Sequence, residues 1–440
     1  MIRAIQNAIR IPELRKRILF TAFILAVYSF GRHITIPGID VAALNRFFQK
    51  LQEQGLPIGF VDLFTGGSLR RMTLFALGVQ PYISASIILQ LLTVVVPYFE
   101  NLAKEGEVGR KKIRQYTRYG TVLLGAIQSL GISFTLENPG SLGINIPLVH
   151  TPGLGFKLMT MVTLTTGTIL AMWFGEQITE RGIGQGISLI IFAGIVSRIP
   201  SGVASIYRSL FHEQTLNLIQ LLIFIALMVA VIMGTIYITL AVRKIPVQYA
   251  RRVIGRRIYG GQMTHIPLRV NAAGVIPIIF AITLLQFPMT LASLVPLDII
   301  REMVAFIRQP AIYYPIYAAL IIFFTYFYTA VQINPTQMAE NLRKYGGFIP
   351  GIRPGAATAH YIERTLDRIT LPGAFFLAAI AILPAFVQRY LGVQVYFGGT
   401  PVLIVVGVAL DTMQQVEAHL LMRNYEGFLK GIRLRGRRGR

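Results

Sequence analysis

The chain has 440 residues, of which 54% are hydrophobic and only 14% are charged. Soluble domains carry roughly 25% charged residues, so this composition excludes an ordinary soluble protein and indicates a membrane protein with several spans. Its 42 Lys and Arg residues exceed its 19 Asp and Glu residues, an excess expected in the cytoplasmic loops of such a protein. The chain has no cysteine, which excludes disulfides and thiolate chemistry.

Ten windows are long and apolar enough to cross the bilayer, because a core of about 30 Å needs roughly 20 residues of helix. Residues 1–17 precede them and predict an amphipathic segment on the membrane surface, and the first span is expected to act as an uncleaved anchor. The windows lie near residues 18–36, 74–96, 118–136, 156–175, 183–204, 216–242, 272–295, 311–333, 370–388 and 399–421.

Lys and Arg residues set the orientation of these spans. Most of them fall on one side when both termini are cytoplasmic, chiefly in the N-terminal tail, the loops 243–271 and 334–369, and the basic tail 422–440. Five spans in each half, 1–210 and 211–440, then place the second half upside down relative to the first. The expected fold is an all-α polytopic membrane protein made of two inverted five-helix halves.

An internal repeat supports these halves. Residues 77–92 align with residues 273–288, and residues 186–196 align more weakly with residues 399–409. Repeats in a membrane chain are typical of two structural halves with a path between them. The matched pairs include Gly78 with Gly274, Pro81 with Pro277, Ile83 with Ile279, Gln90 with Gln286, Ile191 with Ile404, and Gly194 with Gly407.

Two kinds of residue in the repeat carry functional hypotheses. Spacing alone favours lipid-facing isoleucines, whereas the repeat suggests that four helices point them at one axis as an ion-resisting apolar ring. Gln90 and Gln286 are expected to pack helices together near the symmetry axis, with gating as the sharper alternative. The isoleucines concerned are Ile83 and Ile87, Ile187 and Ile191, Ile279, and Ile404.

Residues 60–73 interrupt the pattern before the second span, with Gly66 and Gly67 and a possible short helix from Ser68. Two alternatives remain equal for this segment: an ordinary surface loop, or a piece that folds back into a shielded cavity. Residues 181–188, RGIGQGIS, predict a flexible helix start.

The two long cytoplasmic loops predict docking surfaces. Residues 243–271 predict two short strands around a basic tip, and Asn334-Pro335 ends the eighth span before a short helix and a proline-rich turn. Exposed arginines on rigid protrusions suit phosphate-rich RNA or an acidic protein. The candidates are Arg251, Arg252, Arg256, Arg257 and Arg353.

Catalytic and metal motifs are not found in the sequence, so we expect no enzyme activity and no cofactor. Asp411 lies within the last span, and we expect it to face a hydrated inner cavity or a polar neighbour. The alternatives to a channel are a secondary transporter with inverted repeats, an intramembrane enzyme, and an insertase without a pore.

Several blocks, among them FALGVQPYISASIILQLLTVV, FGEQITERGIGQGISLIIFAGIV and GFIPGIRPG, resemble the SecY family, the channel subunits of the bacterial Sec translocon. The resemblance covers essentially the whole chain and implies a ten-helix clamshell whose pore constriction is formed by the six isoleucines named above. Thr283 departs from that symmetry, since it takes the repeat position of Ile87. The implied plug is roughly residues 60–72, with Asp62, Leu63, Phe64, Thr65, Gly66, Gly67, Ser68, Leu69 and Arg70 at its centre.

The resemblance also implies a function and partners. The chain would pass unfolded preproteins across the bacterial cytoplasmic membrane and release hydrophobic segments into lipid through a lateral gate near Gln90, Gln286 and Phe287. The long loops would dock the ribosome or the SecA motor. SecE would clamp the two halves, and SecG would attach at the periphery.

Overall fold

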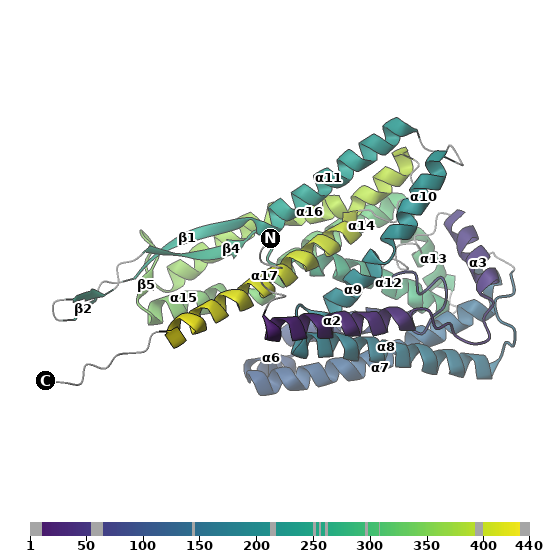
Figure 1. Ribbon diagram of the computed structural model, residues 1–440, viewed down its shortest axis with the longest axis horizontal. Coiled ribbons are helices and arrows are strands. Elements are labelled where there is room, and N and C mark those ends of the chain that lie inside the picture. The colour runs from purple at the N-terminus through teal and green to yellow at the C-terminus, as the bar shows by residue number, and fades with distance from the viewer. Residues whose placement is uncertain are drawn as a thin grey trace. The chain divides into compact units, whose positions relative to one another are not determined.

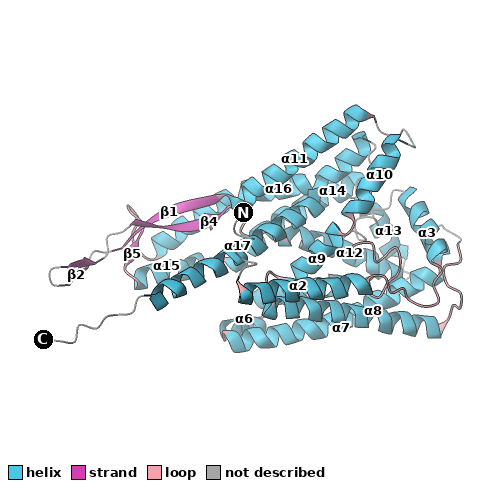
Figure 2. Ribbon diagram, viewed as in Figure 1, coloured by secondary structure: helices cyan, strands magenta, loops and turns pink. Residues whose placement is uncertain are grey.

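Helices form most of the chain, and the few strands gather in one region near α15 (Figures 1 and 2). The computed structural model describes residues 11–53, 65–142, 146–211, 217–249, 252–254, 257–259, 263–294, 298–307, 309–391 and 399–431. The amphipathic segment predicted for residues 1–17 therefore lies largely outside the described residues.

Each of the ten expected windows holds a helix. They are occupied by α2 (Pro12–Gly31), α5 (Gln80–Val95), α7 (Glu107–Glu137), α8 (Leu154–Arg181), α9 (Gly186–Val196) with α10 (Ile199–Phe211), α11 (Leu218–Leu240), α12 (Ile276–Leu294), α14 (Pro310–Gln332), α16 (Ala356–Leu391) and α17 (Gly399–Gly431). The remaining helices are α3 (Val41–Glu53), α6 (Pro97–Lys104), α13 (Asp298–Ile307), α15 (Pro335–Lys344) and the short 3₁₀ helix η1 (Pro139–Leu142).

Within the described residues, seven helices are long and apolar enough to span a membrane by themselves, or eight if the bent pair α5 and α6 counts as one span. The helix α2 falls short because its first turns carry Glu13, Arg15, Lys16 and Arg17. In α12 the apolar stretch of described residues runs only from Ile276 to Leu285, which is too short to span a membrane by itself.

The chain forms two compact units, one of residues 1–200 with 408–440 and the other of residues 201–407. In the first unit α7 packs along α5 and α8. Small residues allow this close packing, because Thr121 and Ser129 are fully buried and Gly125 faces Thr165 and Pro81. The domain boundary at residue 210 stays a prediction.

An apolar cluster covers one end of this helix layer. The amphipathic α3 contributes Leu44, Phe47 and Phe48, which pack with Met72 and Leu164. Asp40 begins α3 by accepting hydrogen bonds from the backbone N–H groups of Ala42 and Ala43. A carboxylate in this place satisfies donors that have no partner inside the helix.

In the second unit α14 packs against α16 and α12. Phe280 of α12 meets Phe324 of α14 edge to face, with ring centroids 5.6 Å apart. The helix α11 also contacts α16, where Gly234 lies against the ring of Phe376. Only 17% of the apolar window of α11 is buried, which suits a surface that faces lipid.

Four strands follow α11 and a fifth follows α15, and together they form a small subdomain of the second unit. The antiparallel pair β1 (Val242–Tyr249) and β4 (Met263–Arg269) confirms the two strands predicted in the loop 243–271. A two-residue strand, β5 (Gly347–Phe348), extends this sheet on the other side of β1. The tip carries a second pair, β2 (Arg252–Ile254) and β3 (Arg257–Tyr259).

This subdomain has its own apolar core. Ile245 and Val247 of β1 are buried on one face, as the period of two requires, and contact Leu342 of α15 and Ile362 of α16. The eighth span ends at Gln332 and α15 begins at Pro335, as the Asn334-Pro335 pair predicts. The side chain of Asn334 caps α15 by accepting a hydrogen bond from the Gln337 N–H.

Candidate functional site

The two repeated segments adopt the same local backbone at the start of α5 and α12. Gly78 and Gly274 both have left-handed backbones, with φ of +55° and +61°. One turn later the Ile83 N–H donates to the Val79 carbonyl at 3.1 Å, and the Ile279 N–H donates to the Val275 carbonyl at 3.4 Å. The equivalent glycines therefore form the same turn before each helix, because glycine adopts a left-handed backbone without steric cost.

The six candidate ring isoleucines fall into two groups by burial. Ile87, Ile191 and Ile404 are 6%, 3% and 1% exposed, whereas Ile83, Ile187 and Ile279 are half-buried. Ile187 packs against α8, since a Cβ placed on Gly175 would lie 2.6 Å from its Cγ1. The grouping of all six isoleucines around one axis stays a prediction.

Gln90 is half-buried on α5, and its amide donates to Ser86 Oγ at 3.4 Å, one turn earlier on the same helix. The helix-packing role expected for Gln90 near the symmetry axis, like the gating alternative, stays a prediction. The side chains of Gln286 and Phe287 lie outside the described part of the structure.

The segment before α5 is buried although it is not helical. Thr65 and Ser68 are each 2% exposed, and Gly66, Gly67 and Met72 have positive φ. The helix predicted to begin at Ser68 is wrong, because these left-handed residues turn the chain instead. The burial favours a segment that is shielded by protein over an ordinary surface loop. Of the expected plug residues, Asp62, Leu63 and Phe64 lie outside the described residues.

The glycine-rich loop between α8 and α9 is held by side chains from three helices. Its Ile183 and Gly184 N–H groups donate to Thr21 Oγ1 of α2 at 3.1 Å and to Gln415 Oε1 of α17 at 3.0 Å. The Gly186 N–H donates to Thr179 Oγ1 at 2.9 Å. These bonds give the loop a defined conformation, and the flexibility expected for this helix start stays a prediction. Sequence reasoning missed Thr21, Thr179 and Gln415, because acceptors so far apart in the sequence meet only in the fold.

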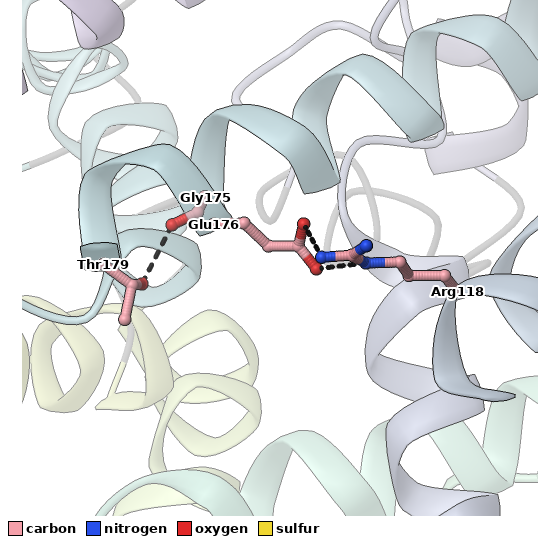
Figure 3. A network of polar contacts seen from close by, with 4 residues as sticks. All are labelled: Arg118, Gly175, Glu176 and Thr179. Carbon is pink, nitrogen blue, oxygen red and sulfur yellow. Dashed lines mark hydrogen bonds and ion pairs between the residues drawn. The ribbon is translucent and has the colours of Figure 1, made fainter. Parts of the chain in front are cut away.

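An ion pair joins α7 and α8 close to this loop. Arg118 Nε and Nη2 reach the two carboxylate oxygens of Glu176 at 2.9 and 2.8 Å (Figure 3). Figure 3 also shows Thr179 donating to the Gly175 carbonyl, at 2.9 Å. Two parallel bonds fix the relative position of the two helices better than a single contact does.

The docking candidates lie in the strand subdomain and in the turn after it. Arg353 is exposed, and its carbonyl accepts a hydrogen bond from Thr358 Oγ1 at 2.9 Å. Gly351 and Gly355 have positive φ on either side of it, so the turn has a defined shape. Arg252 and Arg257 lie on paired strands without described side chains, and Arg251 and Arg256 lie outside the described residues.

The described residues contain no group of three or more His, Cys, Asp and Glu side chains that could hold a metal ion. Asp411 lies on α17 with an exposed side chain, and its role stays a prediction.

Known proteins similar to this chain define its class. A family model described as SecY matches residues 73–413. Protein translocase subunit SecY of Halalkalibacterium halodurans is 48% identical over 98% of this chain and all of its own length. The subunit of the same name from Escherichia coli K12 is 46% identical over 96% of each chain.

Solved structures agree on the fold. A structure described as that of a protein conducting channel has a TM-score of 0.61 at 18% identity and covers 94% of this chain and 96% of its own. The canine Sec61 channel in its ribosome complex has a TM-score of 0.54 at 17% identity, with the same coverage.

The fold and the matches together define a helical membrane channel for proteins, in a class of translocation channels rather than of enzymes. Two of its features, the repeated helix starts and the buried segment before α5, lie within or next to the matched residues. The chain belongs to the SecY family.

Proposed function

We propose that this chain passes unfolded preproteins across a bacterial cytoplasmic membrane and releases hydrophobic segments sideways into lipid. The observation that carries the proposal is the near full-length similarity to translocase subunits, at 48% identity. The repeat adds independent support, since Gly78 and Gly274 begin the equivalent helices α5 and α12 with the same backbone turn. A transporter would instead need a charged or unwound midplane site.

In this proposal the six isoleucines form an apolar constriction. Branched apolar side chains bind a passing chain only weakly and resist ions by excluding water. The segment before α5 closes the pore in the resting state, and Gln90, Gln286 and Phe287 line a gate that opens toward lipid. A structural relative described as SecY, whose plug domain is said to stabilise the closed state, gives this assignment a precedent in the same fold.

The strand subdomain and the turn at Arg353 serve as the cytoplasmic docking surface. Two structural relatives are described as ribosome-bound channels, which supports a ribosome as one partner of this chain. We further propose docking of SecA at the same arginines, SecE across the two halves and SecG at the periphery. Both termini then lie in the cytoplasm, as the Lys and Arg distribution predicts.

A crosslinking experiment tests the proposal and exploits the absence of cysteine in the chain. One cysteine replaces Ile87 or Ile404, and a second is placed in a secretory substrate arrested during transport. We expect a disulfide at both positions. The matched control places the cysteine at Ile88, which follows Ile87 on α5 and is 41% exposed. If the arrested substrate reacts at position 88 and never at 87 or 404, the proposed path is wrong.

A further inference from the structure

Arg32 directly follows the last residue of α2 and connects three parts of the first unit. Its Nη1 donates to Ser197 Oγ at 2.8 Å, just after α9. Its Nε donates to Ser68 Oγ at 3.3 Å, and its Nη2 donates to the Gly66 carbonyl. One half-buried guanidinium thus holds the buried segment 65–68 between the ends of α2 and α9.

The backbone of the segment is shaped to fit this guanidinium. A Cβ on Gly66 would lie 2.5 Å from Arg32 Nη2 and 2.8 Å from the Gly194 Cα. The φ of +64° at Gly66 and +89° at Gly67 turns the Gly66 carbonyl within reach of Arg32. A second guanidinium, that of Arg198, lies beside Gly67, because a Cβ there would be 3.6 Å from Arg198 Nε.

The three acceptors named for Arg32 are a carbonyl and two hydroxyls, all of them neutral. Hydrogen bonds to neutral acceptors are weaker than bidentate bonds to a carboxylate, so these three bonds can each be exchanged for a bond to water. Only the fork of a guanidinium reaches three acceptors in fixed directions, which a lysine ammonium cannot do.

We infer that Arg32 is a latch that positions residues 65–68 against α2 and α9 and keeps the segment in its buried place. It acts on the segment and not on a passing chain, so it is a positioning residue. The inference rests on the proposed function only for its consequence, which is that releasing the latch opens the ion seal. The latch itself is a claim about local structure and can be tested without transport.

The test measures how fast a buried cysteine reacts. Thr65→Cys introduces the only thiol of the chain at a position that is 2% exposed. Purified full-length protein in detergent is mixed with a maleimide, and the labelling rate is compared among Arg32, Arg32→Gln and Arg32→Lys backgrounds. We expect the rate to rise at least about tenfold in Arg32→Gln, because two or three charge-assisted hydrogen bonds are lost. Arg32→Lys should give most of that rise.

The control is Arg46→Gln, which removes the same charge from an exposed position on α3 and should leave the rate unchanged. Size-exclusion profile and melting temperature verify that each variant is folded. If Arg32→Gln does not fold, Arg32→Lys decides the question. A labelling rate within about twofold of the parent in the folded variants overturns the latch, since lost bonds of this kind shift an opening equilibrium further than that.

Ion conductance of the same variants in planar bilayers separates the latch from the proposed function. Faster labelling with increased conductance supports both. Faster labelling with unchanged conductance supports the latch and contradicts the assignment of the segment as the seal of the channel.

Discussion

At the scale of single residues, close backbone contacts decide several positions that the sequence alone leaves open. Gly186 begins α9 against the Gly175 carbonyl of α8, and a Cβ there would also lie 2.8 Å from Ile178 Cβ. Gly155, in the first turn of α8, has nothing within 4 Å of a Cβ. A side chain at Gly186 would therefore clash with α8, whereas a side chain at Gly155 has free space.

We predict that Gly186→Ala lowers the free energy of unfolding by about 1–3 kcal/mol, because the added methyl group overpacks the contact between α8 and α9. Gly155→Ala is the matched control and should be neutral or stabilising by up to about 1 kcal/mol. Thermal unfolding in detergent, followed by circular dichroism, measures both. Equal effects of the two substitutions would contradict the packing argument.

A second residue-scale prediction concerns the ring. Ile87→Asn should increase the ion conductance of the resting channel, because an amide retains water where a branched apolar side chain excludes it. Ile88→Asn, one position further on α5 and 41% exposed in the parent, should change it little. Planar bilayer recordings measure the difference, and a leak caused by Ile88→Asn alone would remove Ile87 from the ring.

At the scale of elements, charged side chains fix helix ends and helix pairs. The N–H groups of Ala43 and Ala42 hold the pKa of Asp40 below its ordinary value, so α3 begins at a charged cap. The helices α7 and α8 are joined near one end by Arg118 and Glu176 and at the other by Lys157 and Glu137, which are 3.0 Å apart. These ion pairs fix the register of α7 against α8, whereas apolar contacts alone would allow the two helices to slide along each other.

We predict that Asp40 makes the stability of the chain pH-dependent in acid. Because its pKa is lower in the folded state than in the unfolded state, its contribution is present above the unfolded pKa of about 3.9. That contribution is lost as the pH falls through the folded pKa. Asp40→Asn keeps the capping oxygen and should reduce the acid dependence, whereas Asp40→Ala should also destabilise the chain at pH 7. Acid titration of helical circular dichroism compares the three proteins, and identical acid midpoints would contradict the role of this cap.

The two ion pairs of α7 and α8 should differ in strength. Arg118 and Glu176 are 49% and 19% exposed, whereas Lys157 and Glu137 are 24% and 7% exposed. A double-mutant cycle with glutamine substitutions should give a coupling of about 0.5–1 kcal/mol for the first pair, reduced by 1 M salt. The second pair is expected to give the larger coupling with less dependence on salt. A larger coupling free energy for Arg118 and Glu176 than for Lys157 and Glu137 would show that exposure does not determine the strength of these ion pairs.

At the scale of the whole molecule, each unit has an apolar core of its own among the described residues, and the proposed docking residues belong to the second unit. The strand subdomain and the Arg353 turn belong to the unit of residues 201–407, with Ile245 and Ile362 in a shared cluster. The buried segment before α5 and its arginine latch belong to the other unit. We therefore expect mutations at the proposed docking residues and mutations at Arg32 to act independently of each other.

We predict that Arg353→Glu weakens ribosome or motor docking by about tenfold while the melting temperature stays unchanged, because the side chain is exposed and belongs to the proposed docking surface. Arg46→Glu on α3 makes the same charge change at an exposed residue that is not among the proposed docking residues, and it should preserve binding. Sedimentation with purified ribosomes and transport into vesicles measure the two variants. Normal binding and transport by Arg353→Glu would exclude this arginine from the docking surface.

The sequence by itself determined the ten helices, the repeat and the family, since long apolar runs and matched residues such as Pro81 and Pro277 need no tertiary information. It also predicted two strands in the loop 243–271, since Val247 and Tyr249 alternate with polar neighbours, and β1 and β4 confirm them. It could not find the acceptors Thr21 and Gln415 or the bonds of Arg32 to Ser68 and Ser197. Those contacts were decided only by the tertiary structure. Apolar periodicity is a local property of the chain, whereas a hydrogen bond between residues far apart in sequence exists only after packing has brought them within about 3 Å.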